Sequence, residues 1–274
     1  DLVHADETTI QVLKEPGKKA QTKSYLWAQA TGSGPPIRLF GYARGRGATH
    51  AETLYVGIKR GAALMSDGYE VYGGVAEANG LSHLGCWAHC RRYFVEAEAV
   101  IPKTARSPEQ PAAQFIAAIA ELYAVEARAR DLTLEQRHAL RQEYSQPILV
   151  KIEAMLLKHL HAVVPGSLLG KALHYLSAQW PKLIRYADNG LWPIDNNLCE
   201  NAIRPFVVGR RNWLFADTVA GAHASANLYS IIETCKANSI DPYAYLVSLF
   251  RKLPTAQTVD DFERLLPWCL ANAD

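Results

Sequence analysis

Short apolar and β-branched runs dominate the first third of the sequence. Residues 2–13, 24–31 and 37–42 each have the length and composition of a strand, and the turn-forming segment 32–36, Gly-Ser-Gly-Pro-Pro, separates the last two. The pattern predicts three consecutive antiparallel strands at the start of the fold.

The spacing of apolar residues then changes from that of a strand to that of a helix, and back. Leu54 and its apolar neighbours fall at helical spacing within residues 49–60, and residues 62–66, Ala-Ala-Leu-Met-Ser, form a short apolar run typical of a buried strand. Because a helix lies between two strands, a parallel crossover is expected. With a helix at 69–78 and a fifth strand at 81–86, this part of the chain predicts a five-stranded mixed α/β sheet.

Helical periodicity dominates the next hundred residues, from about 91 to 189. Residues 111–129 are rich in alanine and amphipathic, and residues 133–136, Thr-Leu-Glu-Gln, form a capping box that opens another helix. Pro147 should break or restart that helix, and residues 167–187 add a further one. The stretch predicts a large all-α insertion.

Mixed patterns return near the end of the chain. Residues 194–203 predict a short helix, residues 206–215 are ambiguous, and residues 224–237 predict another helix. Asp241 followed by Pro242 is the signal of a capped last helix.

The composition indicates that the chain can form a folded core. It also indicates that any affinity for nucleic acid must come from local clusters of basic residues. The chain has 274 residues, of which 49% are hydrophobic and 20% charged, and its formal net charge is +2, so the overall field attracts a polyanion only weakly. Basic residues cluster near candidate chemical positions instead: Arg44 and Arg46, Arg91 and Arg92, and Arg204, Arg210 and Arg211.

The cysteines and the first residues of the sequence are informative about the cellular compartment of the protein. Five cysteines are scattered through segments that otherwise predict core elements, so a disulfide framework is not expected. No signal peptide opens the sequence and no apolar stretch reaches the roughly 18 residues of a spanning helix, so we expect a cytoplasmic protein without membrane partners. Since residue 1 is Asp1 rather than methionine, we expect a fragment of a longer polypeptide whose N-terminal recognition region is absent.

Five motifs stand in order along the chain and carry a resemblance. They are residues 4–8 (HADET), 66–69 (SDGY), 86–94 (CWAHCRRYF), 195–205 (DNNLCENAIRP) and, towards the end, 233–246 (ETCKANSIDPYAYL). In this order they resemble the catalytic region and C-terminal signature of the DDE transposases of the insertion-sequence-66 family, over nearly the whole chain. The sequence departs from the expected pattern at Asn201, where a basic residue is expected after the glutamate.

The resemblance implies an RNase H-like, retroviral-integrase-like fold. An acid in the first strand and a second acid after the strand that follows the first helix agree with that layout. The expected division is an RNase H-like core at 1–95, a helical insertion subdomain at 96–192, the rest of the core with the glutamate helix at 193–237, and a C-terminal helical segment at 238–274.

Three acids are the expected catalytic residues and metal ligands: Asp6, Asp67 and Glu200. Phosphodiester cleavage needs an activated water and a stabilised leaving oxygen, and two divalent ions about 3.5 to 4 Å apart provide both. Carboxylate oxygens suit Mg²⁺ or Mn²⁺. We expect Asp6 to bridge two ions, with Asp67 binding one and Glu200 the other.

Further residues near these acids are candidates for DNA binding. Asn197, Glu200 and Arg204 fall close to one face of a helix, and arginine binds phosphate oxygens in pairs. The full set of expected DNA contacts is His89, Arg91, Arg92, Asn197, Arg204, Arg210, Arg211 and Trp213.

Each acid also has a simpler explanation. Asp67 before Gly68 is a common turn or helix cap, Asp6 could face solvent from a strand, and Asn197 with Glu200 is a capping-box pattern. The joint catalytic interpretation depends on motif order rather than on any one residue.

Other patterns have weaker functional interpretations. His83, Cys86, His89 and Cys90 could bind zinc, but no second ligand pair follows at finger spacing. Residues 44–47, Arg-Gly-Arg-Gly, lack the ending of a P-loop and are expected to form a loop that could touch DNA. The tryptophans are expected mainly in packing, with Trp213 the one best placed for DNA.

The resemblance implies a transposase that hydrolyses DNA at the ends of a mobile element and joins the freed 3′-hydroxyl to target DNA. Expected partners are transposon-end and target DNA, further copies of the chain assembled on DNA, and accessory proteins. Two alternatives stay open: a nuclease or resolvase of the same fold that cuts without joining, and an inactive DNA-binding relic.

Overall fold

The computed structural model describes residues 1–270 and shows a mixed α/β fold with six strands and many helices. The chain divides into two compact units. The first unit contains Val3–Ala62 and the chain from Leu198 onward, and the second contains Ala63–Asn197. The last four residues of the expected C-terminal segment, 271–274, lie outside the described residues.

Three antiparallel strands form the sheet of the first unit, as their apolar runs predict. They are β1 (Leu2–Lys14), β2 (Lys23–Thr31) and β3 (Arg38–Ala43), paired in chain order. A short sixth strand, β6 (Ala216–Thr218), pairs in parallel with β1 at Val12 and Lys14. The prediction of five strands was wrong because it missed β6. This strand has only three residues, too few to form a recognisable strand pattern in the sequence.

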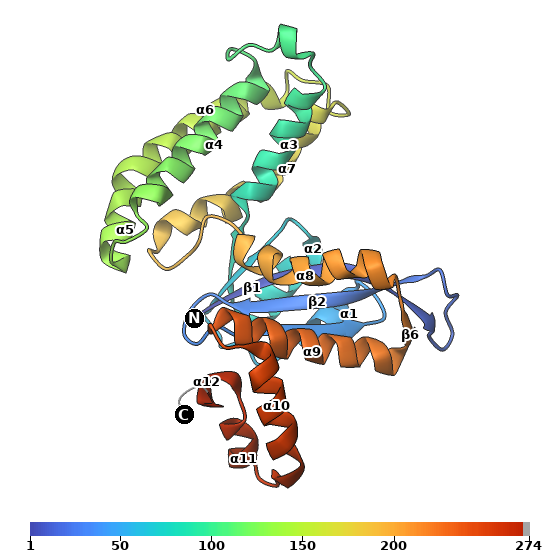
Figure 1. Ribbon diagram of the computed structural model, residues 1–274. Helices are drawn as coiled ribbons and strands as arrows, with labels where there is room; N and C mark the ends of the chain where they lie inside the picture. Colours follow the sequence, from blue (N-terminus) through green and yellow to red (C-terminus); the bar gives the residue numbers. More distant parts are fainter. Residues whose placement is uncertain (271–274) are drawn as a thin grey trace. The chain divides into compact units, whose positions relative to one another are not determined.

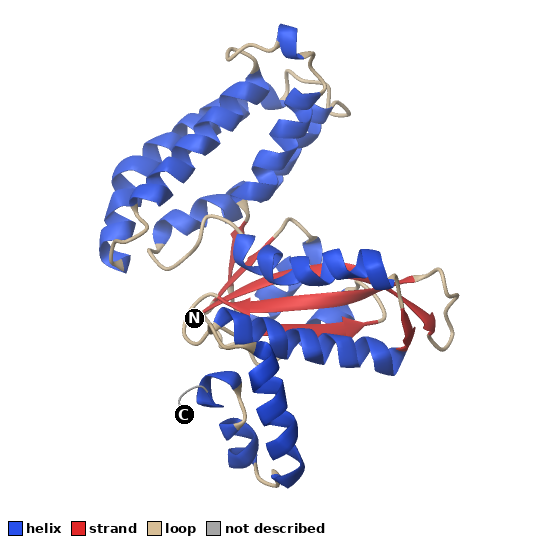
Figure 2. Ribbon diagram, viewed as in Figure 1, coloured by secondary structure: helices blue, strands red, loops and turns tan. Residues whose placement is uncertain are grey.

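Helices α8 (Asn197–Trp213) and α9 (Val219–Ala237) supply the other half of this unit's core (Figures 1 and 2). Side chains alternate across a strand, and Ile10 and Val12 on β1 pack in one cluster with Ala28 on β2 and Phe206 on α8. Asp6 stands at the same parity on β1 as Ile10, so it belongs to the face that α8 covers.

Helix α8 is longer than its pattern predicts. The expected helix stopped at residue 203, whereas α8 continues through Pro205 and the ambiguous segment to Trp213, and Leu214 follows it with a φ of 64°. The buried residues Ile203 and Phe206 continue the apolar face past Pro205, so packing on the sheet outweighs the loss of one helical N–H. Helix α1 (Ala48–Leu54) is shorter than expected and gives way to Gly57 at a φ of 88°.

The C-terminal helices of the first unit pack around a small apolar cluster. They are α10 (Pro242–Lys252), the 3-10 turn Leu253–Thr255, α11 (Val259–Arg264) and α12 (Pro267–Leu270). The Asp241 side chain accepts a hydrogen bond from the Ala244 N–H at 2.6 Å, which confirms the predicted cap.

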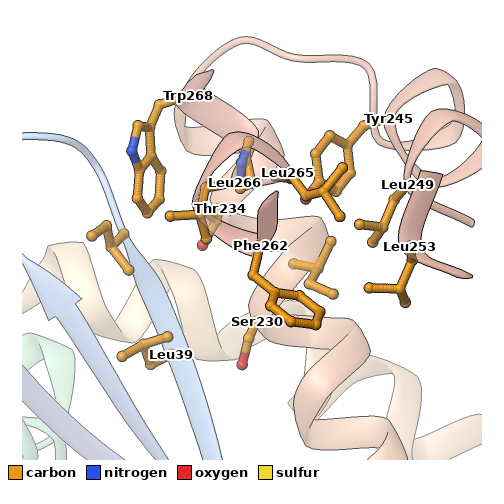
Figure 3. A pocket seen from close by; sticks show the side chains of 13 residues that line it. Leu39, Ser230, Thr234, Tyr245, Leu249, Leu253, Phe262, Leu265, Leu266 and Trp268 are labelled. Atoms are coloured by element: carbon orange, nitrogen blue, oxygen red, sulfur yellow. The ribbon is translucent and has the colours of Figure 1, made fainter. Parts of the chain in front are cut away.

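A hollow of about 350 Å³ lies among these helices, α9 and β3 (Figure 3). Its wall is mostly apolar, with Leu39, Tyr245, Leu249 and Phe262 among the lining residues. None of the described residues that line it has a carboxylate or basic side chain, and these are the groups that phosphodiester chemistry needs.

The second unit begins with the predicted parallel crossover. Strands β4 (Ala63–Ser66) and β5 (Ser82–Gly85) pair in parallel, and α2 (Glu70–Asn79) connects them. The carboxyl ends of parallel strands lie at one edge, so Asp67 and Cys86 follow neighbouring strands at the same edge.

Helices make up the rest of the second unit. They are α3 (Trp87–Ala99), α4 (Pro111–Arg128), α5 (Leu134–Leu140), α6 (Gln146–Leu160) and α7 (Leu168–Leu183), with short 3-10 turns at Lys103–Ala105 and Ile184–Asp188. Their core contains Trp87, Phe94, Phe115 and Leu173.

Two predicted helix signals in this unit can be checked directly. Thr133 and Gln136 make both bonds of the capping box, which confirms that prediction. Pro147 lies in the first turn of α6, directly after a π-helical turn at Arg141–Ser145. At the predicted restart, the chain changes from a π-helical turn to the α-helix α6. The missing N–H of proline is tolerated in the first turn of a helix.

Candidate active site

Asp6 lies in the interior of β1, opposite Ala28 of β2. Its side chain is half-buried, and its Oδ1 accepts a hydrogen bond from the Glu7 N–H at 2.8 Å. Strand alternation directs Asp6 towards the face covered by α8. Asp6 therefore lies, partly exposed, on the helix-covered face of the sheet.

Glu200 lies in the first turn of α8 and is half-buried. Its neighbour Cys199 is fully buried, and the Cys199 Sγ lies 3.6 Å from the carbonyl oxygen of Ala28. Because Ala28 is the residue paired with Asp6, the first turn of α8 packs at the strand position of Asp6. The fold thus brings two residues that are far apart in sequence, Asp6 and Glu200, to one region of the first unit.

The electrostatics of Cys199 report the same proximity. Burial raises the pKa of the Cys199 thiol well above its ordinary value, and the carboxylates of Asp6, Glu200 and Glu7 raise it further, against an opposing effect of Arg38. A thiolate is disfavoured where negative charge is already concentrated. Negative potential of this kind attracts a cation.

Glu7 has a different role from Asp6. Its side chain is 3% exposed and pairs with the guanidinium of Arg46, whose Nε lies 2.6 Å from Glu7 Oε1. The adjacent acids on β1 therefore differ: Glu7 is neutralised by an arginine across from it, whereas Asp6 faces the Glu200 helix. Arg46, expected in a loop that could touch DNA, makes this ion pair.

In the second unit, Asp67 directly follows β4 and is half-buried. Its Oδ1 accepts a hydrogen bond from the Tyr69 N–H at 2.9 Å. Asp67 therefore also stabilises a turn, as expected of an aspartate before a glycine. The Ser66 hydroxyl donates to the Asp67 carbonyl at 3.0 Å. These bonds fix the backbone of Asp67 at the end of the strand.

Lys182 and Tyr175 of α7 lie in the electrostatic environment of Asp67. Burial lowers the pKa of Lys182, the Arg185 cation lowers it further, and Asp67 opposes both. Burial is also the main reason that the pKa of Tyr175 is raised, and the Asp67 carboxylate contributes. Helix α7 of the insertion therefore faces the end of β4.

Two of the four residues in the zinc interpretation, His83 and Cys90, have surroundings that do not suit a metal ligand. His83 Nε2 lies 2.7 Å from the hydroxyl of buried Ser66, and burial, with the nearby cations Lys182 and Arg185, lowers the pKa of His83 to about 3. Cys90 is fully buried in the helical core, and that burial raises its pKa strongly. These two residues are core groups rather than metal ligands.

The expected DNA contacts divide into surface and internal groups. Arg91, Arg92, Arg204 and Arg211 are exposed, and Arg91 lines a hollow of about 380 Å³ together with Tyr123 and Asn197. His89 is half-buried in the first turn of α3.

Arg210 and Trp213 make internal contacts. Arg210 Nη1 donates to the hydroxyls of Thr8 and Thr9 at 3.0 and 2.8 Å and to the Thr9 carbonyl, which ties α8 to β1. Trp213 packs against Phe206 with ring centroids 5.1 Å apart. Packing therefore accounts for both residues without DNA.

Sequence reasoning missed the role of Asp195 and Tyr123. Asp195 Oδ1 accepts from the Asn197 N–H at 3.1 Å, while Oδ2 accepts from the Tyr123 hydroxyl at 2.9 Å and from Asn197 Nδ2 at 2.8 Å. An aspartate just before a helix is a capping signal, and that signal was visible in the motif. The contribution of Tyr123, from the distant helix α4, was not.

Fold and site together define a mixed α/β protein with carboxylates concentrated where a helix packs on its sheet. Residues 1–224 match the family model described as "Transposase IS66 family", and residues 230–268 match "IS66 C-terminal element". The chain belongs to the IS66 transposase family.

Curated relatives cover the chain but extend well beyond it. The chain is 32% identical to "Uncharacterized protein y4jD" of Sinorhizobium fredii (strain NBRC 101917 / NGR234), over 97% of this chain and 53% of that protein. It is also 32% identical to "Uncharacterized protein y4qI" of the same strain, over 98% of this chain and 50% of that protein. The chain thus spans about half the length of these relatives. No helix among the described residues is long and apolar enough to cross a membrane.

Proposed function

We propose that this chain carries the catalytic centre of a DDE-type DNA transposase with an RNase H-like core. The observation that carries the proposal is the packing of Cys199 on Ala28, which joins the Glu200 turn to the strand position of Asp6. Asp67, fixed at the end of β4, is proposed as the third acid. Family membership supports the same role.

The residues suit divalent cations. Burial is the main cause of the raised pKa of Cys199, and the carboxylates of Asp6, Glu200 and Glu7 add to it; Arg46 balances the charge of Glu7. Oxygen donors in a negative environment favour Mg²⁺ or Mn²⁺. We propose that Asp6, Asp67 and Glu200 hold two such ions. When bound, the ions would activate the attacking oxygen and stabilise the leaving oxygen.

The reaction has two steps in this proposal. Water attacks a phosphodiester at the element end, the P–O bond to the 3′-oxygen breaks, and a 3′-hydroxyl is released. That hydroxyl then attacks a phosphodiester of target DNA, so that one P–O bond forms as another breaks and no external energy source is needed. Arg204, Arg91 and Arg92 would hold phosphate groups from the protein surface, and assembly of several copies on DNA belongs to the same proposal.

Replacement of each acid by its amide tests the proposal. Asp6→Asn, Asp67→Asn and Glu200→Gln should each lower metal-dependent cleavage of labelled element ends by on the order of a thousandfold, because an ion contributes several kcal/mol to the transition state. Asp217→Asn is the matched control, since Asp217 is exposed and pairs with Lys14 on the surface. Wild-type activity in any of the three amide variants contradicts the triad.

Substrates that already carry free 3′-hydroxyl ends separate a transposase from the alternatives. A transposase joins such ends to target DNA in Mg²⁺ or Mn²⁺. A nuclease or resolvase of the same fold cuts intact ends and yields no joined product, and an inactive relic binds DNA without turnover.

A further inference from the structure

The segment that leads into the Glu200 helix is fixed by three separate interactions within the second unit. The Asn196 N–H donates to Cys86 Sγ at 3.3 Å, and the Trp87 N–H donates to the Ile194 carbonyl at 3.1 Å. Both bonds attach residues 194–196 to the junction between β5 and α3. The third interaction is that of Asp195 with Tyr123.

Asp195 holds the first turn of α8 through its carboxylate. Its Oδ1 accepts from the Asn197 N–H, one of the helix N-terminal donors that lack an intrahelical partner. Negative charge at this place also stabilises the positive end of the helix dipole. Glu200 lies within the same first turn. The orientation of the Asp195 carboxylate therefore affects the turn that contains Glu200.

Tyr123 determines that orientation from α4. Its hydroxyl donates to Asp195 Oδ2 at 2.9 Å. Burial, followed by the charge of Asp195, raises the pKa of Tyr123 far above its ordinary value, so the hydroxyl stays protonated and remains a donor. The neighbouring α4 residues Ile119 and Leu122 are fully buried, which gives the tyrosine a rigid base.

We propose that Tyr123 is a positioning residue, whose hydroxyl orients Asp195 and thereby sets the first turn of α8 with the metal ligand Glu200. The proposal rests on the proposed function for the role of Glu200. It also assigns a role to the helical insertion, because α4 fixes the start of the glutamate helix.

The test replaces Tyr123 by phenylalanine, which keeps the ring and removes only the hydroxyl. With intact protein and DNA carrying pre-cut ends, we expect the Mn²⁺ concentration for half-maximal joining to rise about tenfold, because groups that orient a metal ligand typically change metal affinity by that order. The matched control is Tyr186→Phe, which removes a buried phenol oxygen from the core of the same unit. It should leave the half-maximal Mn²⁺ concentration unchanged.

A readout without catalysis accompanies this assay. In the metal-free protein, hydrogen exchange at the amides of residues 197–200 should accelerate about tenfold in Tyr123→Phe and stay at the wild-type rate in Tyr186→Phe. Unchanged exchange together with an unchanged Mn²⁺ requirement overturns the proposal.

A double-mutant cycle separates action through Asp195 from general packing. If Tyr123 acts through Asp195, Tyr123→Phe adds no further effect to Asp195→Ala, whereas independent roles multiply. Should Asp195→Ala fail to fold, Asp195→Asn takes its place in the cycle. An inactive wild type would refute the proposed function while the exchange test still decides the Tyr123–Asp195 coupling. An active wild type with multiplying effects would refute the coupling alone.

Discussion

Thr234 makes two hydrogen bonds to the backbone of Arg38, although the residues lie in different elements far apart in sequence. Its hydroxyl accepts from the Arg38 N–H and donates to the Arg38 carbonyl, each at 3.0 Å. One helical turn earlier, Ser230 accepts from the Phe40 N–H at 2.8 Å. Helix α9 thus satisfies the open edge of β3 with side-chain hydroxyls, and a satisfied edge is protected from pairing with another chain.

Thr234→Val should therefore destabilise the first unit. Valine keeps the shape of threonine but leaves the two polar groups of Arg38 without that partner, which costs about 1–3 kcal/mol when they are buried. Urea unfolding measures the change. The control is Thr53→Val, which removes an exposed hydroxyl bond within α1 and should change stability by less than about 0.5 kcal/mol. Equal effects of the two variants would contradict this role of α9.

Stability should also depend on pH through His83. Its pKa in the folded protein is about 3 because of burial and of the cations Lys182 and Arg185, whereas an unfolded histidine has a pKa of about 6.5. Below that value the unfolded state binds the extra proton, so the stabilisation present at neutral pH declines as pH falls from about 6.5 towards 3. The slope from this one group is about 1 kcal/mol per pH unit.

His83→Gln should flatten this dependence. The free energy of unfolding, measured at pH 7 and at pH 5, should fall less in the variant than in the wild type. His161→Gln, at an exposed position, controls for the loss of an imidazole. A wild-type slope in His83→Gln would show that His83 is not the group responsible.

The sequence predicted the first sheet because the apolar and β-branched runs of β1, β2 and β3 are long enough to recognise. It could not reveal β6, with three residues, or the length of α8, because packing against the sheet decides whether Pro205 ends that helix. The identity of the candidate acids came from motif order. Their surroundings, such as Cys199 on Ala28 or Tyr123 on Asp195, depend on contacts between distant segments that no local pattern records.

Neighbouring arginines on α8 should separate stability from DNA binding. Arg210 bonds Thr8 and Thr9 of β1, whereas Arg211 is exposed. Arg210→Ala should lower the free energy of unfolding by about 1–3 kcal/mol, since it removes bonds to a charged group. Arg211→Ala should leave unfolding unchanged, weaken DNA binding, and reduce the salt dependence of binding by about one ion. The reverse pattern would assign the DNA contact to Arg210.

A side chain at position 68, where the protein has Gly68, should clash with the ring of Tyr175. A Cβ at Gly68 would lie 2.7 Å from Tyr175 Cε2, closer than two carbon atoms can approach. Gly68→Ala should therefore move either the tyrosine or the backbone beside Asp67, at a cost of about 1–3 kcal/mol. If Asp67 is a metal ligand as proposed, this displacement should also raise the Mn²⁺ concentration needed for DNA cleavage.

Removal of the obstructing ring tests the cause. In the Gly68→Ala, Tyr175→Ala double variant the clash is absent, so the penalty of Gly68→Ala should be smaller than in the wild-type background, and the Mn²⁺ requirement should return towards that of Tyr175→Ala alone. Gly73→Ala provides a comparison without a clash, because a Cβ there meets no atom within 4 Å, and it should stabilise α2 by about 0.5–1 kcal/mol. Equal penalties with and without the Tyr175 ring would place the strain in the Asp67–Gly68 backbone itself, and the contact with α7 would then have no part in holding Asp67.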